Sequence, residues 1–287
     1  MESKNKISPA GLSRRKFLTI GATVLASPLT GMAEKILPRE LKGNIKYEQF
    51  ISEQINKIKE IINHKKYDDI LSSPYLVYCL YYSQSFLDQV SDPKNRHYVS
   101  EKIIGSVAHL ITPEFRAQAI LSLEEQTKDE ECLENRKIST SETLPLKKFI
   151  FGQGENHNNA IDLFTDELSP VYSTDSGLVL VADNGWRPND DLSSSSIKGG
   201  NTVIIFNYLK KEFYRYAHLN NVAVHCRELV IEGEKLGVVG HTGNASRKGH
   251  GHHLHFEIHK YLDDKNTNQA LWASDLRKRL ENLKHIT

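Results

Sequence analysis

HLHFEI, residues 253–258, is the stretch from which the fold and the chemistry of this chain can first be read. In a β-strand successive side chains alternate between the two faces. We therefore expect His253 and His255 to share one face and Leu254 and Phe256 to enter a core. Two imidazoles on one face can serve a single metal centre, either as two ligands or as a ligand and a catalytic partner. A histidine pair alone is also found by chance on surface strands.

Two upstream segments strengthen the metal hypothesis. In the first, strand alternation predicts that Tyr214, Tyr216 and His218 share one face, opposite Phe213 and Ala217.

The second upstream segment carries His157 and Asp162, five residues apart. Catalytic zinc commonly takes three protein ligands and keeps one position open for water. A set of two histidines and one aspartate would keep the metal a Lewis acid that activates water near neutral pH.

The second half of the chain has the pattern of an all-β region. Short runs rich in apolar and β-branched residues alternate with glycine, asparagine and lysine turns, which indicates mostly antiparallel strands. The expected strands are 171–182, 202–208, 213–219, 228–239 and 253–261. We expect 184–200 to be a long exposed loop and 268–284 to be a helix.

The region before it is predicted to be helical. Isoleucines recur at helical spacing at positions 51, 55, 58 and 62, and Thr112-Pro113-Glu114 is typical of a helix start. Two further candidates are residues 75–90 and 98–111. The tyrosines at 75, 78, 81 and 82 could form a ligand surface, but an aromatic helix face is more often core. The fold class is therefore α+β, with a helical region at 34–140 and a β-sheet domain at 141–287.

Residues 1–33 have the layout of an export signal. Arg14-Arg15 precedes an apolar run from Phe17 to Leu29, which is too short for a good membrane span. The arginine pair resembles the twin-arginine export signal, and small residues around Met32 favour cleavage after Ala33. We expect a bacterial protein exported to the periplasm, with secretion as the alternative and no membrane attachment after cleavage.

Composition excludes some other functions. The chain has 37 basic and 36 acidic side chains, so nothing in its net charge predicts nucleic-acid binding. Its three cysteines, at 79, 132 and 226, match neither a zinc ribbon nor a disulfide framework. No Gly-x-Ser-x-Gly elbow supports serine chemistry. The oligomeric state is left open.

Taken together, residues 148–261 resemble the lysostaphin and LytM type of zinc metalloendopeptidases. Five separated motifs occur in the family's order and near its spacing. They are NAID at 159–162, SPVY with DSGLV at 169–179, YAHL at 216–219, GEKLGVVG with TG at 233–243, and HLHFE at 253–257.

The resemblance implies a role for each matched residue. His157, Asp162 and His255 would ligate Zn²⁺. His218 and His253 would be the catalytic histidines, with His253 favoured as general base and His218 helping to hold the oxyanion. The implied substrates are peptides of bacterial peptidoglycan.

Two positions depart from the family pattern. The usual first motif places histidine four residues before the aspartate, where this chain has Asn158, so His157 is the expected ligand across one extra residue. His252 stands where the family usually has proline. For His252, and for His241, His250 and His259, surface placement is the default expectation.

Two alternatives are weighed against the endopeptidase. Some members of the family lack metal ligands and regulate other wall hydrolases as binding proteins. A zinc carboxypeptidase would typically have glutamate before histidine in its second motif. The His-Leu-His sequence at 253–255 therefore argues against a carboxypeptidase.

Overall fold

The computed structural model describes residues 45–96, 98–134, 138, 141–152, 158–186, 198–247 and 249–284. The predicted signal segment, His157 and most of the predicted 184–200 loop lie outside these residues. Within the described part of the chain, no helix is both long enough and apolar enough to span a bilayer.

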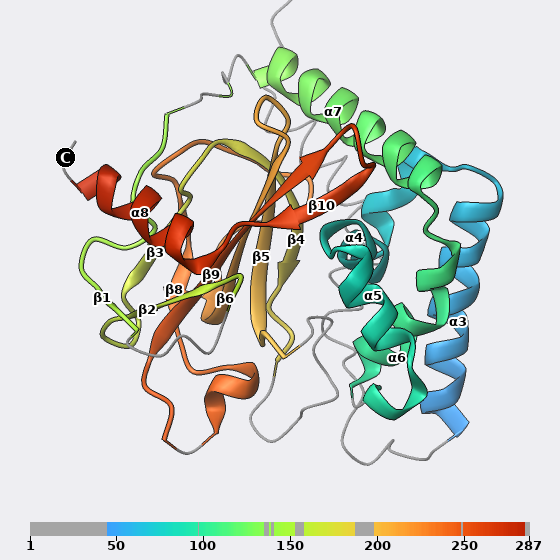
Figure 1. Ribbon diagram of the computed structural model, residues 1–287, viewed down its shortest axis with the longest axis horizontal. Helices are drawn as coiled ribbons and strands as arrows, with labels where there is room; N and C mark the ends of the chain where they lie inside the picture. Colours follow the sequence, from blue (N-terminus) through green and yellow to red (C-terminus); the bar gives the residue numbers. More distant parts are fainter. Residues whose placement is uncertain are drawn as a thin grey trace, which may run out of the picture. The chain divides into compact units, whose positions relative to one another are not determined.

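The first half is helical, as its periodicity predicts (Figure 1). The isoleucines of the first helix face the core, with Ile58 fully buried. Thr112 accepts a hydrogen bond from the backbone N–H of Phe115 at 3.1 Å, which confirms the predicted helix start. The α-helices of this region are α3 (Ile45–Asn63), α4 (Pro74–Tyr81), α5 (Gln84–Ser91), α6 (Val99–Val107) and α7 (Pro113–Glu134), with 3-10 turns between them.

The second half is one antiparallel sheet, which confirms the predicted fold class. Its central order is β1-β2-β9-β6-β5-β4-β7, while β10 pairs with β9 and β8 pairs with both β3 and β6. The strands are β1 (Ile150–Phe151), β2 (Ile161–Phe164), β3 (Pro170–Tyr172), β4 (Gly177–Asp183), β5 (Asn201–Asn207), β6 (Glu212–Val222), β7 (Leu229–Val230), β8 (Lys235–Val239), β9 (His253–Leu262) and β10 (Thr267–Ala270).

Three expected elements differ from the structure. The expected strand 171–182 is divided into β3 and β4 by a turn at residues 173–176. The expected strand 228–239 is divided into β7 and β8 by a turn that needs Gly233 at φ +77°. The helix expected at 268–284 begins at Ala273 as α8 (Ala273–Lys284), because residues 267–270 pair with β9.

The two faces of the sheet pack against different helices. The first, here called the α8-side face, buries Leu254, Phe256 and Ile258 of β9 in one core with Leu276 and Leu280 of α8. The second, the helix-side face, joins Phe206 and Phe213 to the core of the helical region. Figure 1 shows α8 and the helices α3–α7 on different sides of the sheet. This arrangement confirms that Leu254 and Phe256 enter a core while the histidines beside them face the other way.

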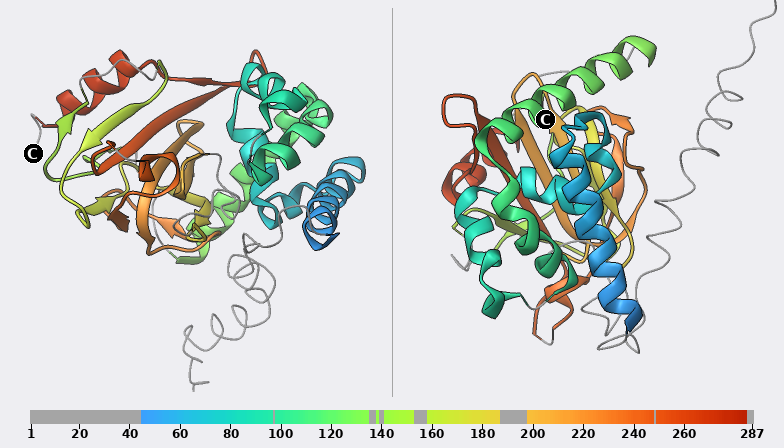
Figure 2. Two further views of the ribbon diagram at one scale, coloured as in Figure 1. Left: turned by 90° about the horizontal axis from the view of Figure 1, so that it is seen from below. Right: turned by 90° about the vertical axis from the view of Figure 1, so that its right-hand side faces the viewer.

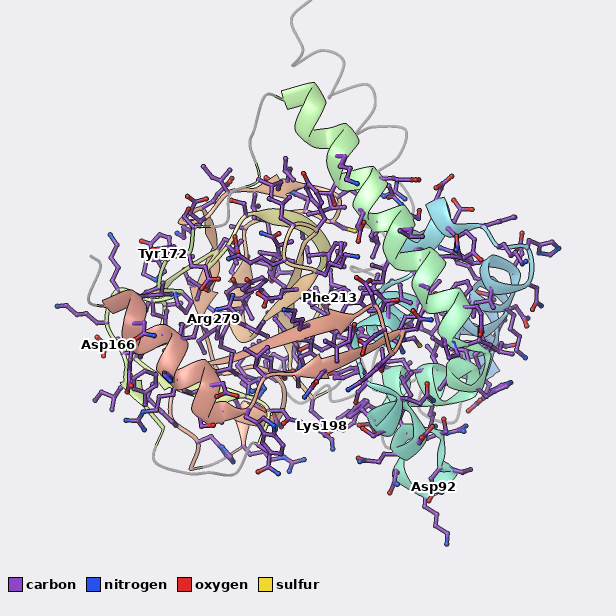
Figure 3. All side chains as sticks on the ribbon, turned by 45° about the horizontal axis from the view of Figure 1, so that its top comes forward. Asp92, Asp166, Tyr172, Lys198, Phe213 and Arg279 are labelled. Atoms are coloured by element: carbon purple, nitrogen blue, oxygen red, sulfur yellow. The ribbon has the colours of Figure 1, made fainter. Side chains whose placement is uncertain are left out.

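Polar contacts as well as apolar packing fix the helical region on its face. Asn268 of β10 donates to the backbone carbonyls of Leu80 and Tyr81, at 2.8 Å for Tyr81. Nearer the predicted loop, Nζ of Lys198 lies 3.9 Å from a carboxylate oxygen of Glu101 on α6 (Figure 3). Figure 2 gives two further views of these helices beside the sheet. The end of α4 is therefore held directly against the sheet.

Candidate metal centre

Four of the five predicted site residues meet on the helix-side face. Asp162 of β2 is the cross-strand partner of His255 on β9, and His255 Nδ1 lies 2.9 Å from Asp162 Oδ1. His253 stands two residues earlier on the same strand face, with Nε2 3.8 Å from the same oxygen. The His218 ring centre lies 4.9 Å from that of His253 and 5.6 Å from that of His255. The fifth residue, His157, is outside the described residues.

His218 reaches this cluster through an irregularity in β6, and the prediction that it shares a face with Tyr214 and Tyr216 is wrong. Those two tyrosines enter the α8-side core. The pairing of β6 with β5 shifts register just before Leu219, and His218 has φ +63°. A bulge of this kind re-aims a side chain that regular alternation would place on the opposite face.

The loops around His218 keep it in place. Its N–H donates to the carbonyl of Gly199 at 2.8 Å, and its Nδ1 lies 2.8 Å from the carbonyl oxygen of Thr242. Neighbouring Gly200, at φ +64°, allows close approach, because a Cβ there would lie 2.3 Å from the Thr242 hydroxyl. The paired loops thus fix both the backbone and the ring.

Hydrogen bonds to backbone carbonyls fix the tautomers of two histidines. A carbonyl oxygen only accepts, so His218 Nδ1 carries a proton that it donates to Thr242. His253 Nδ1 likewise donates to the carbonyl of Gly251 at 2.8 Å. In the neutral state both residues therefore keep the Nε2 lone pair available. Burial lowers the pKa of both rings, and the neighbouring histidines lower that of His218 further, which favours the neutral state.

His255 has the opposite electrostatics because it lies between two carboxylates. Its Nδ1 faces Asp162, and its Nε2 donates to Glu257 Oε1 at 2.8 Å. Burial acts to lower its pKa, but hydrogen bonds to Asp162 and Glu257 outweigh burial and raise the pKa to about 9. The proton on Nδ1 is the one that a metal ion would replace.

The donor chemistry of Asp162 and His255 fits zinc. With ligand bonds of about 2.0–2.2 Å, two ligands of a tetrahedral zinc ion lie roughly 3.4 Å apart, so the two atoms, now hydrogen-bonded at 2.9 Å, would separate by about 0.5 Å to hold the ion. A ligating histidine commonly donates its other ring N–H to a carboxylate, as His255 does to Glu257. Within the described residues, no three His, Cys, Asp or Glu side chains are grouped so as to hold a metal ion. The predicted third ligand, His157, falls outside that set.

Several polar residues beside the cluster have no role predicted from the sequence. Arg215 of β6 is the cross-strand partner of Glu257 and lies 2.6 Å from its Oε1. His259 lies 3.0 Å from Oε2 of the same carboxylate. Strand alternation puts Glu257 and His259 on the face of His255. This alternation is the sequence signal from which their place beside the site could have been predicted. The surface placement expected for His259 is wrong, because its side chain is buried under α4.

The remaining histidines of this segment lie more outward. His250 is exposed, and His241 and His252 are partly exposed, with ring centres 5.0 Å apart. Nε2 of His252 lies 3.8 Å from Glu167. Their placement agrees with the surface expectation.

An antiparallel sheet with an aspartate–histidine cluster on one face thus forms a candidate metal centre, and comparison with known proteins points to a peptidase. Residues 156–269, less than half of the chain, match the model of Peptidase family M23. The match supports an M23 peptidase domain in this part of the chain, and it spans all five predicted site residues.

Curated relatives include both a hydrolase and activators of hydrolases. The chain is 32% identical over 123 residues to the Peptidoglycan DD-endopeptidase ShyB of Vibrio cholerae, covering 43% of this chain and 25% of the relative. It is 29% identical over 108 residues to the Murein hydrolase activator NlpD of Escherichia coli, covering 38% and 24%. The chain therefore spans about a quarter of the length of the curated relatives it matches.

Similar solved structures come from peptidases. Lysostaphin from Staphylococcus simulans is 21% identical, with 50% of this chain and 55% of that chain covered and a TM-score of 0.37. A zinc containing peptidase from Vibrio cholerae is 27% identical, with 42% and 34% covered and a TM-score of 0.29.

Proposed function

We propose that the chain is a zinc-dependent endopeptidase that hydrolyses peptide bonds of bacterial peptidoglycan. The observation that carries the proposal is the convergence of Asp162, His218, His253 and His255 on one sheet face from three different strands. The M23 match over the same residues supports it. The substrate class is inferred from the family resemblance and from the printed activity of the Vibrio cholerae relative.

In this proposal His157, Asp162 and His255 hold the zinc ion. When bound, zinc would polarise the peptide carbonyl and activate a water molecule for attack on it. The protein presets two of these ligands, because Asp162 and His255 are paired across neighbouring strands. Glu257 keeps the His255 ring oriented so that Nδ1 faces Asp162.

His253 and His218 are the proposed groups that accept and donate the proton of the attacking water. Each donates Nδ1–H to a carbonyl and presents Nε2 as a base, and burial keeps each ring neutral. His253 is the proposed general base because its Nε2 lies beside Asp162. His218 in this tautomer has no Nε2 proton, so it stabilises the oxyanion only after it has gained one.

The proposed location is the bacterial periplasm, after export by the twin-arginine route. This part of the proposal rests on residues 13–33 of the sequence, with its arginine pair and short apolar run. Peptidoglycan peptides would be accessible to the folded enzyme there.

The matches to relatives named murein hydrolase activator favour a second candidate. In that case the same domain would bind and regulate another wall hydrolase without cutting peptides itself. The two functions differ in whether the protein holds zinc and digests peptidoglycan alone.

The test begins with the zinc content of the purified mature chain beside two adjacent variants, His157→Ala and Asn158→Ala. We expect near-stoichiometric zinc in the unmodified protein, loss in His157→Ala and retention in Asn158→Ala. Purified peptidoglycan is then incubated with each protein and the released peptides are identified by mass spectrometry. Digestion should follow zinc content.

Two results would overturn the enzyme proposal. One is an unmodified chain that holds no zinc in chelator-free buffer. The other is a zinc-loaded chain that releases nothing from peptidoglycan alone but accelerates a separate wall hydrolase added to it. The second result would establish the regulator instead.

A further inference from the structure

The row of polar side chains on β9 continues past His255 to a carboxylate enclosed by four partners. Glu257 is 7% exposed. Its Oε1 contacts His255 Nε2 at 2.8 Å and Arg215 at 2.6 Å. Its Oε2 contacts His259 at 3.0 Å and accepts a hydrogen bond from the hydroxyl of Tyr81. Buried carboxylates with this many donors have one preferred orientation.

One of the four partners comes from the helical region. Tyr81 is the last residue of α4, 176 positions before Glu257 in the chain, and its ring is fully buried. The ring stacks on that of His259, with centres 4.1 Å apart and planes inclined by 28°. Tyr81 thus links the helices to the sheet both through an aromatic stack and through its hydroxyl.

The backbone that carries Tyr81 is also fixed. The carbonyl of Tyr81 accepts from Asn268 of β10 at 2.8 Å. The neighbouring carbonyl of Leu80 accepts from Asn268 and from the buried guanidinium of Arg116 on α7. Asn268 of β10 and Arg116 of α7 therefore both hold the end of α4, and this keeps the hydroxyl of Tyr81 in contact with Glu257.

Glu257 in turn sets the state of the proposed metal ligand. Its Oε1 accepts the Nε2 proton of His255, which leaves Nδ1 as the nitrogen facing Asp162. If Glu257 rotated away, the Nε2 proton would lose its acceptor and the ring would lose its fixed orientation. Groups that orient a ligating histidine in this way typically contribute about 10–100-fold to metal affinity.

We propose that Tyr81 is a positioning residue of the metal centre, acting through Glu257 on His255, so that the helical region completes the outer shell of the site. This inference rests on the proposed zinc function. It assigns the helical region a structural part in metal binding, so the sheet domain without these helices should bind zinc more weakly. Tyr81 contacts Glu257 and His259, neither of which is a proposed zinc ligand.

The test measures zinc affinity in the full mature chain by competition with a chromogenic chelator. The key variant is Tyr81→Phe, which removes only the hydroxyl. Its matched control is Tyr75→Phe, which removes a hydroxyl from a buried tyrosine at the other end of the same helix. We expect Tyr81→Phe to raise the zinc Kd about 10-fold or more, and Tyr75→Phe to leave it within about twofold.

A double-mutant cycle with Glu257→Gln separates positioning from general destabilisation. Once Glu257 has lost its charge, adding Tyr81→Phe should change the Kd little further. Thermal unfolding of each metal-free protein is recorded beside the affinity. If Tyr81→Phe lowers the unfolding temperature but leaves the Kd at the Tyr75→Phe value, the residue is merely structural and the inference is overturned.

The outcomes also distinguish this inference from the proposed function. Zinc bound equally well by the unmodified chain and by Tyr81→Phe overturns the positioning role and leaves the enzyme proposal standing. Absence of zinc binding in the unmodified chain overturns both.

Discussion

Both faces of β6 and β9 are buried, yet they differ in the kind of side chain that they carry. The α8-side face is filled by Tyr214, Tyr216, Leu254, Phe256 and Ile258. The helix-side face carries Arg215, His253, His255, Glu257 and His259, all less than 10% exposed. The same strands therefore support an apolar core on one side and, beside the core residue Phe213, an ionisable cluster on the other.

The contrast in composition indicates that the α8-side face stabilises the fold, whereas the helix-side face carries the proposed site. Burying each large apolar side chain contributes about 1.5–3 kcal/mol. Removing a charge from water costs several kcal/mol, and pairing only partly offsets that cost. Arg215 and Glu257 thus add little net stability, although removing one partner would be costly. Retaining such a cluster is understandable when its members hold a reactive site.

The largest effect is expected from a change that disables the polar face without disturbing the fold. Asp162→Asn removes the carboxylate from the proposed ligand set at a side chain that is 22% exposed. We expect zinc and peptidoglycan digestion to fall to background, while the free energy of unfolding of the metal-free protein changes by less than about 1 kcal/mol. A chelator should cause the same loss in the unmodified chain, reversed by added zinc.

Asp166→Asn, the same chemical change at an exposed position four residues on, is the control (Figure 3). It should keep full zinc content and activity. If the two variants behave alike, Asp162 has no metal role.

The converse change disables the apolar face. Phe256→Ala leaves a cavity beside Tyr216, whose ring centre is 5.2 Å away, and should lower the free energy of unfolding by about 3–5 kcal/mol. Urea unfolding followed by circular dichroism measures the loss. Leu209→Ala, at a side chain 49% exposed, should change little.

Under conditions where Phe256→Ala is still folded, its activity per folded molecule should stay within a few-fold of the unmodified chain. Loss of activity without loss of stability would show that the two faces are not separable.

Local pattern predicted much of this arrangement. The alternation of HLHFE placed His253 and His255 opposite Leu254 and Phe256, and the structure confirms it. Isoleucine spacing and the Thr112 cap predicted helices that are present. These features depend on neighbours within one element, so the sequence of that element is sufficient.

Features set by distant pairing could not be predicted in the same way. His218 leaves its expected face because β6 bulges against β5. The α4 tyrosines were correctly expected in a core, but nothing near Tyr81 in the sequence indicates that its hydroxyl meets Glu257. Residues 267–270 form a strand because β9 offers an edge, which overrides their helical composition.

The bulge at His218 gives a smaller, purely catalytic prediction. His218→Asn keeps a residue that tolerates positive φ and removes the imidazole. If His218 assists the oxyanion, kcat should fall about 10²–10³-fold. Zinc content should be unchanged, because His218 is not a proposed ligand. His225→Asn, at an exposed side chain, is the matched control. Zinc lost together with activity would instead place His218 among the ligands.

The hydroxyl of Tyr214, at the edge of the apolar face, reaches an ionic cluster whose titration should change stability only modestly. It lies 2.7 Å from Asp175, whose other partners include Lys210 at 2.6 Å. Lys210 and Arg279 (labelled in Figure 3) also bind Glu142. Burial acts to raise the pKa of Glu142, but these two cations outweigh burial and hold it below the ordinary 4.5. For Asp175 burial prevails and its pKa is above the ordinary 3.8.

The two carboxylates should therefore give opposite pH dependence. Glu142 contributes stability that is complete above about pH 4.5 and is lost as the pH falls through its lowered pKa. The advantage of the unmodified chain over Glu142→Gln should shrink in that range. Asp175 binds a proton more readily when folded, so the advantage over Asp175→Asn should grow as the pH falls toward 3.8. Urea unfolding between pH 3 and 7 measures both slopes, each at most about 1.4 kcal/mol per pH unit. Slopes of the same sign would mean that burial does not distinguish these two groups, and that the edge of the apolar face is as well solvated as the surface.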